Sequence, residues 1–287
     1  MNRNKRCGAF YTFGRVVGLA CVLIVASAAQ AGGNQPPATA AQPTAPQVLK
    51  AIYGKDSHGE SNFDIDQGRY ASYWFSYSFS LGGVSYFTGF ASTAPPTPPG
   101  LDTTFVPGLQ ATITVATYRQ ASAGTHSAWS LLGTQSNVGQ FGDRGNANEV
   151  DTDQTPPSYH TAAGRLVLAI PEGTQVSGEW VSSYELFAFD PHLIGKNAAY
   201  WSYLGNVESG EDNSPSCGSN SAANIACEKS LGKVTFVPDQ GEDMPAIQVN
   251  MSGTDEDVQG HLRNLGSSDV RHYRYDATSK TYKEIKP

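Results

Sequence analysis

The clearest pattern of hydrophobic and polar positions lies between residues 72 and 81, where apolar and polar side chains alternate strictly. Trp74 falls on the polar face among serines. A period of two residues predicts a β-strand that is buried on one side. Gly82-Gly83 supplies the positive φ angles of a tight turn, and a second β-run over 84–90 completes a predicted hairpin. The apolar face consists of Tyr73, Phe75, Tyr77, Phe79 and Leu81.

Further short runs rich in Val, Ile, Thr and aromatic residues follow, separated by segments rich in Pro, Gly, Asp and Asn. The two runs nearest the C-terminus, 270–275 and 281–285, predict a hairpin closed by residues 276–280. No window of a dozen residues has the 3.6-residue period of a capped helix, so we expect little helix. About ten short strands predict an all-β fold, an antiparallel β-sandwich or barrel. The runs are 111–118, 165–170, 178–189, 200–204, 233–237, 246–251, 270–275 and 281–285.

The folded part is expected to be a single all-β domain over residues 48–287, because chains of this length form one sandwich or barrel. Pro156-Pro157 offers an alternative, a sub-domain boundary near residues 156–164. Upstream, residues 32–47 contain four prolines and no charge, with almost nothing to bury. This composition predicts a disordered, extended Pro/Ala/Gln-rich tether.

Residues 1–31 predict a cleavable secretory signal peptide. A basic region without acidic residues precedes a largely apolar run over 16–26, and Ala29-Gln30-Ala31 fits the small-residue rule for cleavage after Ala31. The apolar run is about 11 residues long, shorter than the roughly 20 of a membrane-spanning helix. No later run is longer, so we expect no integral membrane segment after cleavage and a periplasmic or extracellular location. The alternatives are a buried apolar helix and a lipoprotein modified at Cys21.

Two cysteines, Cys217 and Cys227, lie beyond the expected signal peptide. In an exported protein such a pair is expected to form a disulfide, with two free thiols as the alternative. All 26 acidic residues but only 15 of the 19 basic residues lie beyond residue 31, which gives the mature chain a formal net charge of −11. Such a chain is repelled by phosphate backbones, so no nucleic-acid partner is expected.

Residues 142–153 are dense in oxygen donors. Calcium takes six to eight oxygens on a flexible loop, so this segment is a candidate calcium site, although its spacing departs from the EF-hand pattern. The alternative is a solvated loop of turn-forming residues. No other cofactor is expected. The candidate ligands are Asp143, Asn146, Asn148, Asp151 and Asp153.

Contiguous catalytic motifs are absent from the sequence. There is no Gly-x-Ser-x-Gly, and no two of the six histidines stand at i, i+4. A glycosidase needs two carboxylates about 5 Å or about 6.5–9.5 Å apart. Glu179 and Glu185 share a face of the predicted strand 178–189 but would lie roughly 20 Å apart. Another strand would have to supply a partner for either of them.

Four tryptophans and 14 tyrosines are compatible with a carbohydrate-binding platform, although aromatic residues in β-proteins usually fill the core. Trp74 is the candidate ligand-binding residue, because its neighbours on that face are serines. We therefore expect a non-enzymatic exported β-protein that binds a ligand, a glycan or an envelope partner. The alternative is a secreted or periplasmic hydrolase with a dispersed active site, such as a glycosidase.

Overall fold

A computed structural model describes the chain over 41–66, 69–95, 106–120, 128–194, 199–217, 226–257 and 259–285. The expected signal peptide, residues 1–31, lies outside the described residues, as do residues 32–40 of the expected tether. All the described residues fall within the unit of the chain that spans residues 39–287. No helix in the described ranges is long and apolar enough to cross a membrane.

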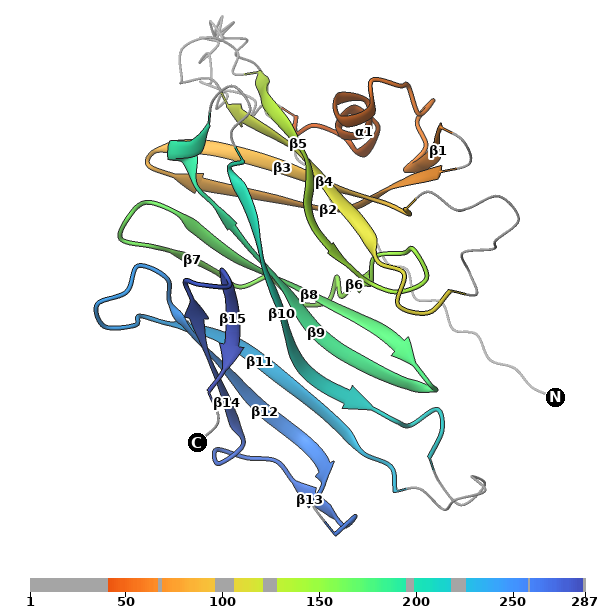
Figure 1. Ribbon diagram of the computed structural model, residues 1–287, viewed down its shortest axis with the longest axis vertical. Coiled ribbons are helices and arrows are strands. Elements are labelled where there is room, and N and C mark those ends of the chain that lie inside the picture. The colour runs from red at the N-terminus through yellow and green to blue at the C-terminus, as the bar shows by residue number, and fades with distance from the viewer. Residues whose placement is uncertain are drawn as a thin grey trace, which may run out of the picture. The chain divides into compact units, whose positions relative to one another are not determined.

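The described part of the chain is all-β, as the sequence predicts, with fifteen antiparallel strands in two sheets and one α-helix (Figure 1). Fifteen exceeds the expected ten or so, and the two longest strands have 13 residues. The five-stranded sheet contains, in spatial order, β1 (Asn62–Asp66), β2 (Arg69–Leu81), β3 (Val84–Thr93), β4 (Ala111–Gln120) and β5 (Trp129–Phe141).

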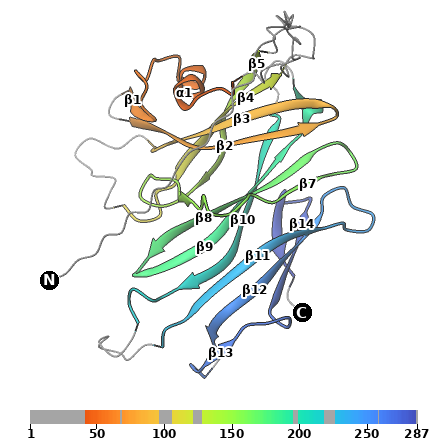
Figure 2. The same cartoon turned by 180° about the vertical axis from the view of Figure 1, so that it is seen from behind.

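The ten-stranded sheet is curved. It curls so that its last strand, β15, returns to contact β10, which makes this part a half-barrel (Figure 2). A short 3₁₀ turn, η2 (Pro191–Leu193), follows β9. The sheet contains β6 (Glu149–Val150), β7 (Ser158–His160), β8 (Leu166–Val176), β9 (Glu179–Phe189), β10 (Trp201–Asp212), β11 (Lys229–Val237), β12 (Ala246–Glu256), β13 (Leu262–Asn264), β14 (Val270–Asp276) and β15 (Thr281–Glu284).

Both predicted hairpins are confirmed. β2 pairs with β3 through Gly82 and Gly83, which have φ values of 58° and 79°, and β14 pairs with β15. The predicted disulfide is also present, with the Cα atoms of Cys217 and Cys227 5.0 Å apart.

The two sheets pack against each other through an aromatic core. Phe90, Phe187 and Trp201 are almost wholly buried there, and the indole N–H of Trp201 donates to Thr117 Oγ1 at 3.1 Å. Gln135 on β5 fixes the junction of the sheets, because its amide donates to the Trp201 carbonyl at 2.7 Å and accepts from the Trp201 N–H at 3.0 Å. The side chain of Gln135 thus makes the two hydrogen bonds that a neighbouring strand would otherwise make.

The helix α1 (Ala45–Tyr53) covers the other face of the five-stranded sheet (Figure 1). Val48 is buried against β3, where any Cβ on Gly89 would lie 2.6 Å from the Val48 methyl groups. Gln47 accepts from the Thr44 N–H at 2.9 Å and so closes the first turn. Residues 45–47 therefore belong to the helix, whereas the sequence analysis assigned them to the tether. The proline at 46 does not interrupt the helix, because it occupies the first turn.

A β-bulge in β2 changes the predicted orientation of Trp74. The register with β3 shifts between Tyr73 and Phe75, which leaves Trp74 as the additional residue. Tyr73 therefore packs on the helix side of the sheet, while Trp74 and Phe75 both pack on the inter-sheet core. The prediction that Trp74 lies opposite the core was wrong, because strict alternation does not continue across a bulge.

Trp74 is half-buried and held on two sides. Its ring centroid lies 5.0 Å from that of Phe141, and its indole N–H donates to the Asn148 carbonyl at 2.8 Å. A role for Trp74 in ligand binding stays a prediction.

This packing predicts that Trp74→Ala and Phe75→Ala each lower the free energy of unfolding by about 3 kcal/mol, because each opens a cavity beside the core. Tyr70→Ala on the same strand is the control, since Tyr70 is 61% exposed and should cost under about 0.5 kcal/mol. Urea unfolding midpoints compare the three variants. A value for Trp74→Ala close to that of Tyr70→Ala would contradict the observed packing.

Candidate functional site

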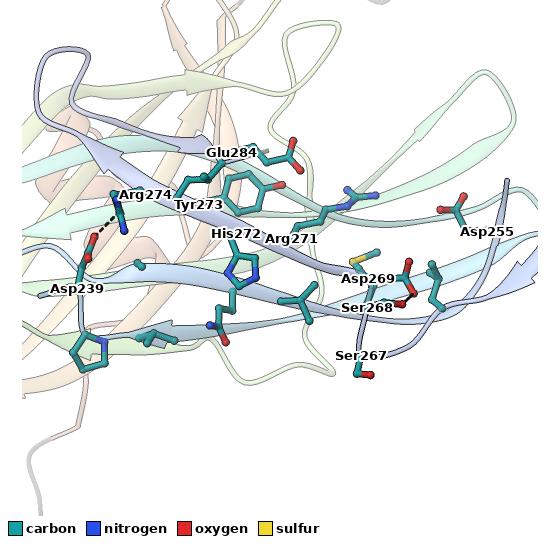
Figure 3. Close-up of a pocket in the computed structure, with 18 of the residues that line it drawn as sticks. Asp239, Asp255, Ser267, Ser268, Asp269, Arg271, His272, Tyr273, Arg274 and Glu284 are labelled. Carbon is teal, nitrogen blue, oxygen red and sulfur yellow. Dashed lines mark hydrogen bonds and ion pairs between the residues drawn. The ribbon is translucent and has the colours of Figure 1, made fainter. Parts of the chain in front are cut away.

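A groove of about 880 Å³ lies on β12, β14 and the segment 265–269 (Figure 3). Gln248 and His272 face each other on the paired strands. Each arginine of the groove already has a carboxylate partner: Arg274 pairs with Asp239 at 2.8 Å, Arg263 with Asp269 at 2.6 Å, and Arg271 with Glu208 at 3.1 Å. These ion pairs offset much of the positive charge that the guanidinium groups would offer to an anionic ligand.

A smaller hollow of about 290 Å³ lies at the edge of the ten-stranded sheet, where β6 pairs with β8. One wall is Trp180, which is 38% exposed and stands opposite Gln175 in the β8–β9 pair. The side chains around this ring are amides, carboxylates and one hydroxyl. The polar lining residues are Asp143, Asn146, Asn148, Glu149, Thr174 and Gln175.

Gly173 fixes the position of the Trp180 ring. A Cβ at residue 173 would lie 2.4–2.6 Å from three atoms of the indole, so the ring can rest on β8 only where the strand has no side chain. The ring is thus supported on one side by backbone and remains partly open to solvent. A ring held in this way loses little conformational freedom when a ligand binds.

The predicted calcium ligands do not converge. Asp143 accepts from the Gly108 N–H at 2.6 Å, and Asp151 accepts from the Asp153 N–H and the Gln154 amide at 3.0 and 2.7 Å. Asp143 thus links its loop to the segment at Gly108, and Asp151 stabilises its own turn. The described residues contain no group of three or more His, Cys, Asp or Glu side chains that could hold a metal ion.

The hollow nevertheless brings together three members of that predicted set, namely Asp143, Asn146 and Asn148, with Trp180. Asp151 and Asp153 do not line it.

Beneath the hollow, two glutamates lie inside the inter-sheet layer. Glu172 on β8 is 2% exposed and Glu185 on β9 is 1% exposed. Glu172 pairs with Ser183 and Glu185 with Ile170, so the two glutamates are diagonal neighbours on one face of the sheet. Carboxylates that are this deeply buried must either accept hydrogen bonds or be protonated and so lose their charge.

Four uncharged side chains donate to this pair. Glu172 Oε1 accepts from Asn148 Nδ2 and from Ser183 Oγ, both at 2.7 Å. Glu185 Oε2 accepts from the Tyr203 hydroxyl at 2.5 Å, and Glu185 Oε1 accepts from Asn206 Nδ2 at 3.2 Å. Asn148 is common to the glutamate pair and the hollow, and its carbonyl accepts from Trp74.

The electrostatics of the pair follow from burial. Loss of solvent raises the pKa of Glu172 and raises the pKa of Glu185 well above its ordinary range, where the charge of Glu172 adds to the effect. Burial and the neighbouring Glu185 charge likewise raise the pKa of the Tyr203 hydroxyl, which therefore remains a donor.

Sequence reasoning found Glu185 but missed its partner. The expected run ended at residue 170, before Pro171, whereas β8 continues to Val176 and so carries Glu172 into the layer. The two side chains lie diagonally on one face of the sheet and are almost fully buried, so neither a sugar nor a catalytic water has access to them. This geometry does not fit a glycosidase pair.

Because the Trp180 ring rests on Gly173, we predict that a side chain at residue 173 would move the ring. Gly173→Ala should displace the ring, change the tryptophan fluorescence spectrum and destabilise the fold by about 1–3 kcal/mol through overpacking. Thr174→Ala, at the next position, adds no atom beneath the ring and serves as the control. Unchanged fluorescence in Gly173→Ala would contradict the packing of Trp180 on β8.

Comparisons of this chain with models of protein families, with curated proteins and with solved structures found no match. The function of the chain must therefore be inferred from the geometry of the site itself.

Proposed function

We propose that the chain is an exported, non-enzymatic protein that binds a neutral glycan in the hollow at Trp180. The observation that carries the proposal is the partly open Trp180 ring, fixed over Gly173 and surrounded by amide and carboxylate side chains. The C–H face of a sugar ring packs on an aromatic face. Its hydroxyls need both donors and acceptors, which Asn and Gln side chains supply together.

The charge of the site supports a neutral glycan over an acidic one. Asp143 and Glu149 line the hollow, and the mature chain has a formal net charge of −11. An anionic polysaccharide would be repelled by both. A neutral sugar meets no such penalty and can donate its hydroxyls to the two carboxylates.

Binding is favoured over hydrolysis because of where the carboxylates lie. Glu172 and Glu185 are in contact but buried, so a substrate has no access to them. Of the carboxylates that line the hollow, Asp143 is engaged by the Gly108 N–H at 2.6 Å and Glu149 is exposed on the short strand β6. A hydrolase with a dispersed site remains the alternative function.

Export is part of the proposal. The basic and apolar segments before Ala31 support it, and the Cys217–Cys227 disulfide is of the kind that persists in an oxidising compartment. A periplasmic or extracellular location would expose the hollow to cell-wall or environmental polysaccharides.

The test uses the mature chain, beginning at Gly32, and a panel of neutral oligosaccharides that includes gluco-, manno- and chito-oligomers. Binding is measured by calorimetry and by tryptophan fluorescence. Trp180→Ala should weaken binding at least about tenfold, equivalent to about 1.4 kcal/mol, and Trp180→Phe should retain part of the affinity.

Two control variants should bind like the wild type. Tyr70→Ala removes an exposed aromatic residue elsewhere, and His272→Ala alters the groove of Figure 3. Loss of binding in His272→Ala but not in Trp180→Ala would move the site to the groove. Failure of the wild type to bind any member of the panel would contradict the proposal.

A further inference from the structure

We infer that Glu172 and Glu185 hold one proton between them in the folded protein, and that this proton ties the stability of the layer beneath the Trp180 hollow to pH. The stability part of this inference is independent of the proposed function. Its consequence for ligand binding rests on that function.

The hydrogen bonds around the pair leave one oxygen without a donor. Glu172 Oε1 and both oxygens of Glu185 accept from neighbouring side chains. Glu172 Oε2 is buried and has no donor among the described residues. A proton on Glu185, donated to Glu172, supplies the missing hydrogen bond and also removes the repulsion between two carboxylates in contact.

Among the described residues, no positively charged side chain pairs with either glutamate to stabilise a second negative charge. Neither glutamate forms an ion pair with a lysine, arginine or histidine of the described residues. The groups that face the pair are Asn148 before β6, Ser183 on β9, and Tyr203 and Asn206 on β10, of which Tyr203 alone is titratable.

The nearest acidic residues on the β6 segment are directed elsewhere. Glu149 pairs with Gly173, so it lies on the opposite face of the sheet from Glu172. Asp151 is engaged by the Asp153 N–H and the Gln154 amide. The two glutamates therefore determine the charge of this part of the layer.

A bound proton fits the pair better than a bound calcium ion. Calcium needs six to eight oxygen ligands, whereas three of the four carboxylate oxygens here are already hydrogen-bonded and the fourth needs a donor. A single proton completes the set without displacing any of these donors.

The direction of the pH effect follows from linkage. Both glutamates have a pKa raised above that of the unfolded chain, so the folded protein binds more protons than the unfolded one. The stabilisation is complete below the ordinary glutamate pKa of about 4.3, and it is lost as pH rises through the folded pKa values.

The Trp180 hollow should depend on pH as well, because Asn148 lines the hollow and also donates a hydrogen bond to Glu172. A second negative charge would separate the two carboxyls and shift the side chain of Asn148. Ligand affinity at the Trp180 hollow should therefore fall over the same pH range as stability.

The experiment measures urea unfolding midpoints of the mature chain from about pH 5 to about pH 9. The wild-type midpoint should fall with rising pH. Glu185→Gln remains neutral and can still donate to Glu172, so its midpoint should exceed that of the wild type at pH 9 and depend less on pH. Glu179→Gln on the same strand, where the side chain is only partly buried, is the matched control and should retain the wild-type slope.

Equal slopes for the wild type and Glu185→Gln would overturn the inference. So would a wild-type midpoint that rises on addition of calcium and is insensitive to calcium in Glu185→Gln, because that result would place a cation between the carboxyls.

A second measurement needs no variant. Unfolding of the wild type at about pH 7 in a pH-stat should release about one proton, because the shared proton dissociates when the glutamates enter water. Absence of proton release would also overturn the inference. Both measurements use protein without ligand, so failure of glycan binding would leave them intact.

Discussion

The structure depends on the layer in which the five-stranded sheet packs against β8, β9 and β10. Full burial of each large apolar side chain in such a layer contributes about 1.5–3 kcal/mol, and Phe90, Phe187 and Trp201 are all almost wholly buried there. The layer is largely aromatic and also contains Glu172 and Glu185. The aromatic side chains hold the sheets together, and the two glutamates make their packing conditional on hydrogen bonds and on a proton.

A chain of contacts links this layer to the surface. The bulge in β2 turns Trp74 into the layer, where its indole N–H reaches the carbonyl of Asn148. The side chain of Asn148 donates to Glu172 on one side and lines the Trp180 hollow on the other. Trp74, which the sequence marked as a surface residue for a ligand, thus contacts the segment that forms the hollow.

The sequence was most informative where one local pattern determined the structure. The alternation over 72–81 with Gly82-Gly83 predicted the β2–β3 hairpin, and two cysteines beyond the apolar N-terminal run predicted the disulfide. The bulge was not predicted, because a one-residue register shift leaves no mark in the alternation. β5 was also missed, because it is rich in Gly, Ser, Gln and Asn, and its extended state depends on pairing with β4.

The candidate site was less predictable because its members come from distant segments. Trp180, Gly173 and Asn148 meet only when β6 pairs with β8 and β8 pairs with β9. Glu172 follows the largely apolar run 165–170 and Pro171. A proline at such a position more often marks the end of a strand, so the sequence did not predict that β8 continues through Glu172.

The central claim is that the buried pair retains a proton in the folded protein. Carbon-13 NMR of the glutamate side-chain carboxyls tests it most directly, with Glu172→Gln and Glu185→Gln used to assign the two signals. The account predicts that at neutral pH one carboxyl of the pair still has the chemical shift of a protonated acid, while exposed glutamates have titrated near the ordinary pKa of about 4.3. If both carboxyls of the pair titrate together with the exposed glutamates, the account is wrong.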